Sequence, residues 1–288
     1  MRITSLMMQM NLKSNLATRM SAIAKASEQA STGLRIETVS DDPVDASQVM
    51  SLQAQIADVE QYKRNGTFAT TQLSTEDAAL SSLRDAIASA KQLAMSTTSA
   101  DPNDPTRQAA LSQALALKDQ IVALGNTRVG DQYVFGGDAN TTPPFQSDGT
   151  YVGNSGAQQV TISDGVSVNV NHPGQPLFTD AITSINGLIT QLQSGTPDQI
   201  AAATDSLQTA DQTALETQSE IGSQLQNIQS TSSNLATQSS QLLDQRDALM
   251  NVDPATSLVT LQQQQTALEQ AYAVVGRVLQ TSLTDYLQ

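Results

Sequence analysis

Apolar residues recur every seven positions in two long segments of this 288-residue chain, and this spacing constrains the fold more than any other feature. A seven-residue repeat lines its members along one stripe of an α-helix that packs on another helix. The spacing therefore predicts two long helices, at about 43–99 and 197–252. Their repeats are Leu52, Val59, Gly66, Leu73, Leu80, Ile87 and Ala94, and Leu207, Ala214, Ile221, Ile228, Leu235, Leu242 and Leu249.

Both ends of the chain carry a stripe of the same kind, with apolar residues at steps of three and four. An amphipathic segment leaves such side chains in water until another helix covers them. We therefore expect 1–40 and about 255–288 to be poorly ordered in the free monomer and to pair as coiled coil in a polymer. The expected interface residues are Leu6, Leu12, Leu16, Met20, Ile23, Leu34, Leu258, Leu261, Leu268, Tyr272, Val275, Leu279 and Tyr286.

Four predicted helices begin with a capping side chain followed by proline. The side-chain oxygen can accept a free backbone N–H, and proline suits the first helical position because it has no N–H to leave unpaired. The four pairs are Asp42-Pro43, Asp104-Pro105, Thr196-Pro197 and Asp253-Pro254. A shorter helix is expected around 182–192, where the apolar spacing outweighs the turn tendency of Asn186-Gly187.

Between about 130 and 180 the apolar period changes to two, which indicates strands, and Asp164-Gly165 predicts a tight hairpin. The predicted fold is mainly α: a long antiparallel helical rod or coiled coil built from both chain ends, with a small β-rich insertion domain. The expected domains are 1–42 with 253–288 as terminal coiled-coil segments, 43–130 with 181–252 as a helical rod, and 131–180 as the insertion.

Composition narrows the class of partner. The net charge of −14 makes nucleic acid and anionic membranes poor candidates. No stretch approaches the ~20 apolar residues of a membrane-spanning helix. The chain has no cysteine, which excludes disulfides and thiol catalysis, and its 3% aromatic content without Trp favours thin helical packing.

Catalytic and metal-binding patterns are weak. His172 is the one histidine and stands in a turn-like sequence, so we expect it to be a surface residue and not a catalyst. Asp138, Asn140 and Asp148 could supply oxygen ligands, but their spacing fits no calcium loop closed by a bidentate glutamate. We therefore predict no enzymatic activity, no cofactor and no metal site.

Short motifs at both ends make the chain resemble the flagellin superfamily. Residues 31–36 read STGLRI and 40–43 read SDDP, which is similar to the superfamily's N-terminal signature, while 220–222 (EIG) and 282–287 (SLTDYL) are similar to its C-terminal motifs. The opening MRIT, the QYVFGG run at 132–137 and ISDGV at 162–166 are most similar to the hook–filament junction family within it. The matching motif residues are Gly33, Arg35, Ile36, Ser40, Asp41, Asp42 and Pro43.

This resemblance implies a secreted structural subunit of the extracellular flagellum, exported by the type III route with a chaperone. It would form a ring of its own copies between hook-associated protein 1 and flagellin. The alternative within the superfamily is a minor flagellin that forms part of the filament itself. From another class, a secreted glycosidase or adhesin would need acid pairs or an aromatic platform in the β region, which has few acids and no Trp.

Overall fold

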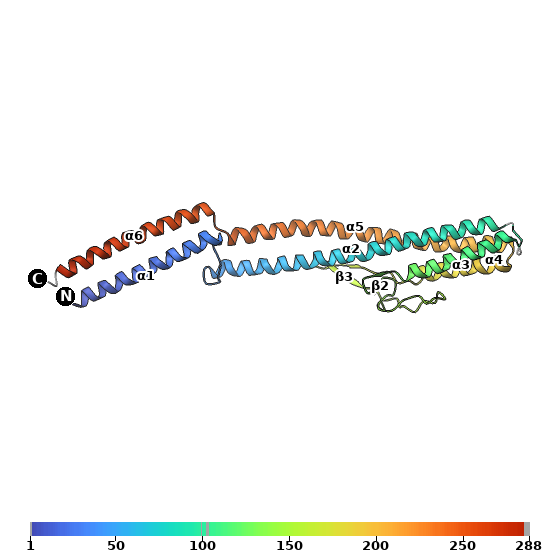
Figure 1. The fold of residues 1–288 in the computed structure, drawn as a ribbon, viewed down its shortest axis with the longest axis horizontal. Coiled ribbons are helices and arrows are strands. Elements are labelled where there is room, and N and C mark those ends of the chain that lie inside the picture. Colours follow the sequence, from blue (N-terminus) through green and yellow to red (C-terminus); the bar gives the residue numbers. More distant parts are fainter. Residues whose placement is uncertain (1, 99, 102–103, 285–288) are drawn as a thin grey trace. The chain divides into compact units, whose positions relative to one another are not determined.

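The computed structural model describes residues 2–98, 100–101 and 104–284 (Figure 1). It divides into two compact units: residues 1–57 with 239–288, and residues 58–238. The helices are α1 (Arg2–Thr32), α2 (Pro43–Thr97), α3 (Pro105–Gly125), α4 (Leu177–Ser194), α5 (Pro197–Met250) and α6 (Pro254–Thr284). The strands are β1 (Arg128–Val129), β2 (Gln132–Tyr133), β3 (Gln159–Ser163) and β4 (Val166–Asn169). The predicted mainly α fold with a small β region is confirmed.

Three of the four predicted helix caps form as expected. The Asp104 carboxylate accepts the Thr106 N–H at 2.8 Å, and Asp42 and Asp253 accept backbone N–H groups in the same way. At Thr196 the bond runs in the opposite sense, because its backbone N–H donates to Gln199 Oε1 at 2.8 Å. A glutamine at the third helical position can thus cap the start of a helix when the preceding hydroxyl does not.

The seven-residue stripes of α2 and α5 form the centre of the 58–238 unit. Leu73, Leu80, Leu207 and Ile221 are fully buried there. The two helices run antiparallel. Arg84 Nε on α2 donates to Asp211 Oδ1 on α5 at 2.9 Å, and Lys91, further along α2, pairs with Gln208, which comes earlier on α5. Leucine, isoleucine and alanine on facing stripes exclude water along the length of the pair.

The β region consists of two small antiparallel hairpins. β3 pairs with β4, with Val160 opposite Val168, and the predicted turn at Asp164-Gly165 is present with Gly165 at φ 67°. The β1–β2 hairpin was not predicted, because two-residue strands give no alternating pattern. Phe135, Phe145 and Ile162 from this region belong to the same apolar core as the helices. The proposed separation of 131–180 as a domain stays a prediction.

His172 does not lie on the surface as expected. Its side chain is largely buried, and Nδ1 is 2.8 Å from Oε2 of the fully buried Glu76 on α2. The turn-like sequence around the histidine is real, but the chain folds that turn back onto α2. The local sequence indicates a turn, but it does not indicate which side of the turn is buried.

Arg107 on α3 is a buried cation, 1% exposed, that binds carbonyl groups instead of carboxylates. Its Nε donates to Leu192 O at 2.8 Å and its Nη2 to Gly195 O at 2.6 Å, with further bonds to Gln191 O and Ala100 O. The last carbonyls of α4 have no partner within their helix and carry its negative dipole end. Arg107 therefore closes the C-terminus of α4 and ties it to α3.

We expect Arg107→Met to destabilise the protein by about 2–4 kcal/mol, because buried carbonyls lose charged donors while the apolar stem is retained. Urea unfolding followed by circular dichroism measures the change. The matched control is Arg128→Met, at an exposed site on β1, with an expected effect below about 0.5 kcal/mol. Equal midpoints for the two variants would contradict this role.

Candidate assembly site

The motif residues 33–43 lie in the unit that contains both chain ends, where the segment after α1 meets the segment after α5. Leu34 and Asn251 form an isolated antiparallel bridge. The Arg35 N–H donates to Met250 O at 2.6 Å, and the Val252 N–H donates to Gly33 O at 2.9 Å. Gly33 ends α1 with φ 72°, a left-handed value that glycine adopts without a Cβ penalty. The motif glycine thus turns the chain into this crossing.

The Arg35 guanidinium connects three segments at the crossing. It donates to Asp42 Oδ2 at 3.2 Å, to Asp45, and to Leu249 O at 2.9 Å, 214 residues further along the chain. The hydrogen bond to Asp45 is the main reason that the pKa of Arg35 is raised. The planar guanidinium offers several donors in fixed directions, which suits simultaneous binding of two carboxylates and a carbonyl.

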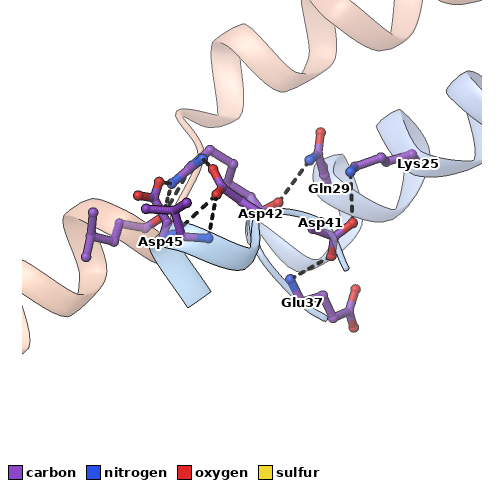
Figure 2. A network of polar contacts seen from close by, with 9 residues as sticks. Lys25, Gln29, Glu37, Asp41, Asp42 and Asp45 are labelled. Carbon is purple, nitrogen blue, oxygen red and sulfur yellow. Dashed lines mark hydrogen bonds and ion pairs between the residues drawn. The ribbon is translucent and has the colours of Figure 1, made fainter. Parts of the chain in front are cut away.

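Asp41 organises the turn between α1 and α2, and Figure 2 shows its contacts with Lys25 and Glu37. Its Oδ1 is 2.8 Å from Lys25 Nζ, and its Oδ2 accepts the N–H groups of Thr38 at 2.9 Å and Glu37 at 3.2 Å. The Lys25 contact, followed by the backbone donors, holds the pKa of Asp41 well below its ordinary value of 3.8. The stabilisation is therefore present above that value and is lost in acid, as the pH falls through the lowered pKa.

The other motif positions have different environments. Asp42 caps α2, and the N–H of Asp45 is the main cause of its lowered pKa. Pro43 begins α2, and Ile36 is buried. Ser40 is exposed. Asp45 belongs to the same site but was missed, although an acid in the first turn of a helix is a signal that could have shown it.

The stripe residues of both ends lie on α1 and α6, which pack side by side within the chain (Figure 1). Half-buried members are Leu12, Leu16, Ile23, Leu261, Leu268 and Val275. Met20, Leu258 and Tyr272 are 53%, 59% and 49% exposed. The side chains of Leu6 and Leu279, and all of Tyr286, lie outside the described residues.

Leu34 was expected on the α1 stripe, and this placement is wrong. α1 ends at Thr32, and Leu34 lies in the bridge with Asn251. The positive φ of Gly33 interrupts the helix, so the apparent spacing continues past the point where the helical face ends. That both ends are poorly ordered before assembly stays a prediction.

These two helices expose further large apolar side chains, among them methionines of α1 that the sequence had suggested as an adaptable binding surface. Exposed members are Met7 and Met10 on α1 and Val259 and Val274 on α6. Together with Met20, Leu258 and Tyr272 they make up the outer apolar set, which the α1–α6 contact leaves in solvent. These seven large apolar side chains are distributed around the sides of α1 and α6 that the α1–α6 contact does not cover, where other helices could contact them.

The structure also bears on two other classes of site. Within residues 2–98, 100–101 and 104–284, no helix combines the length and apolarity needed to cross a bilayer. In the same residues no three acidic, histidine or cysteine side chains gather as metal ligands.

Comparison with known proteins identifies the class. Residues 3–140 match the model of the bacterial flagellin N-terminal helical region. The chain is 28% identical to flagellar hook-associated protein 3 of Escherichia coli strain K12, over 93% of this chain and 94% of that protein. It is 31% identical to flagellar hook-associated protein 3 of Salmonella typhimurium, over 64% of this chain and 58% of that one.

A solved structure supports the fold independently. The crystal structure of Bacillus cereus FlgL superposes with a TM-score of 0.62 at 22% identity, covering 68% of this chain and 99% of that one. The chain is thus similar to the flagellin N-terminal helical region over residues 3–140. Along most of its length it is similar to flagellar hook-associated protein 3, the likeness that the motifs at both of its ends predicted.

We expect Arg35→Lys to loosen the crossing, because an ammonium cannot reach Asp42, Asp45 and Leu249 O with the geometry of the guanidinium. The Val252 amide, which donates to Gly33 O across the crossing, should exchange with solvent about tenfold faster. Hydrogen exchange read by NMR or mass spectrometry measures the change. Arg19→Lys, an equally conservative replacement at an exposed site of α1, should leave the rate unchanged. Identical rates in both variants would remove Arg35 from this role.

Proposed function

We propose that this chain is a non-enzymatic structural subunit of the bacterial flagellum that joins the hook to the filament. The outer apolar set on α1 and α6 is the observation that carries the proposal. Side chains such as Leu258 and Val274 are more than half exposed in the single chain. Each large apolar side chain buried on assembly contributes about 1.5–3 kcal/mol.

The proposed partners follow from the likeness of the chain to flagellar hook-associated protein 3. It would pack against further copies of itself in a ring, against hook-associated protein 1 on the hook side, and against flagellin on the filament side. A cytoplasmic export chaperone would bind it before type III export.

The two faces of α6 give a direct test of assembly. Leu258→Asp places a charge on the exposed face, so we expect a monomer with normal helicity that does not join a polymer. Leu268→Asp places the same charge on the half-buried face toward α1, so it should reduce helicity of the monomer as well. Circular dichroism of the monomer and co-sedimentation with purified hook-associated protein 1 and flagellin read the two effects.

The matched control is Gln263→Asp, which changes an exposed polar position on α6 and should preserve assembly. Normal assembly by Leu258→Asp would remove the outer apolar set from the proposed function. Loss of helicity in Leu258→Asp would show that this face is already packed in the monomer.

Deletion of the gene separates the junction role from that of a minor flagellin. A junction subunit predicts cells that retain hooks and shed flagellin into the medium. A minor flagellin predicts that a filament remains. Electron microscopy of the cells and quantification of flagellin in the medium measure the outcome, and restoration by the wild-type gene but not by Leu258→Asp links it to the outer apolar set.

A further inference from the structure

Five polar residues from three parts of the 58–238 unit make a cluster that the assembly role does not use. Gln72 and Glu76 are four residues apart on α2 and share a face, as do Glu220 and Gln224 on α5. His172, from the segment between β4 and α4, bridges the helices: its Nδ1 is 2.8 Å from Glu76 Oε2, and its Nε2 is 4.0 Å from Glu220 Oε1.

Three side-chain oxygens of this cluster are buried without a hydrogen-bond donor: Gln72 Oε1, Glu76 Oε1 and Gln224 Oε1. A carboxylate oxygen in this position would add negative charge where two other acceptors already lack donors. A protonated carboxyl carries no charge, and its O–H is a donor that an amide oxygen can accept. A proton on Glu76 Oε1 would therefore remove the charge from that oxygen and supply a donor for one of the two amide oxygens.

We propose that the Glu76–His172 pair holds one proton in the folded protein and acts as a pH-sensitive latch that fastens the segment after β4 to α2. With the proton present, the pair is either a neutral acid beside a neutral imidazole or an ion pair. Loss of the proton leaves a buried carboxylate beside a neutral ring. The inference does not depend on the proposed flagellar role.

Burial is the main cause that raises the pKa of Glu76 from 4.5 to about 7, and the contacts with His172 oppose it. A carboxyl group with a raised pKa binds its proton more tightly in the folded than in the unfolded chain. Its contribution to stability is therefore complete below about pH 4.5 and is lost as the pH rises to about 7. The latch is closed in mild acid and loosens above neutrality.

The charged groups facing the pair are few. His172 approaches Glu76 from the post-β4 segment, and Glu220 faces the ring from α5 with its own side chain 59% exposed to water. Arg84, two turns along α2, is occupied by Asp211 and Gln218. Asp77 lies about 100° further round α2 and so on another face. Within the described residues, the ion pair with Glu76 is made by the His172 ring, which can hold the proton in its place.

The latch acts on the segment that connects β4 to α4. Next to His172, the Asn171 side chain accepts the Gln158 N–H at 2.6 Å and donates to Gly156 O at 3.0 Å. Two residues on, the Gly174 N–H donates to Phe135 O at 2.8 Å. Release of His172 from α2 would therefore loosen a segment that is hydrogen-bonded to Gly156, Gln158 and Phe135 of the β region.

The chain's single histidine makes the test unambiguous, because one imidazole gives one set of ring resonances. NMR of the full-length monomer between pH 5 and 9 would follow the His172 ring nitrogens and the exchange rate of the Gly174 amide, corrected for intrinsic exchange. We expect the Gly174 exchange rate to change in one step near pH 7, the raised pKa of Glu76, and to be about tenfold faster at the alkaline end.

Three variants separate the alternatives. Glu76→Gln keeps the shape of the protonated acid and removes the titration, so the Gly174 step should vanish; His172→Gln should give fast exchange at every pH. Glu220→Gln, which changes the exposed acid, should keep the wild-type step.

A pH-independent Gly174 rate in the wild type overturns the proposal, as does a step that persists in Glu76→Gln. If Glu76→Gln does not fold, a wild-type ring titration without a matching Gly174 step overturns it equally.

Discussion

Burial of the seven-residue stripes on α2 and α5 is the interaction on which the other features depend. Residues such as Leu73, Leu80 and Ile221 are removed from water completely, so the two helices form a fixed framework within the 58–238 unit. The Arg107 closure of α4, the phenylalanine cluster of the β region and the Glu76–His172 pair all use backbone or side chains that this packing positions. Disruption of the packing between α2 and α5 would therefore disturb all three features.

The crossing around Arg35 is held differently, because little apolar area is available there and polar contacts join the segments. Two carboxylates and a carbonyl converge on one guanidinium, and Asp41 binds the preceding turn. Partly exposed ion pairs contribute little individually. Here the Arg35 guanidinium that pairs with Asp42 and Asp45 also donates to Leu249 O, 214 residues away, so the site defines geometry more than it adds stability. That is a physical reason for a motif of acids, proline and glycine at this point.

The terminal helices combine two kinds of apolar surface. One face of α1 meets α6 and is half buried, while the outer apolar set remains in water. Under the proposed function, the half-buried face pairs the two terminal helices with each other, and the outer apolar set is covered by neighbouring subunits in the polymer. This arrangement is what joins the fold to the proposed role in a polymer.

The sequence by itself determined the helices, the three aspartate caps, the Asp164-Gly165 hairpin and the resemblance to the flagellin superfamily, because each depends on residues close together along the chain. Only the tertiary structure decided which carbonyl Arg35 binds, which half of the terminal stripes is covered, and that His172 lies against Glu76, 96 residues away. Apolar spacing identifies a face but not its partner, and a turn-like sequence does not tell which side is buried. These outcomes depend on how distant segments pack, and no local pattern in the chain encodes that.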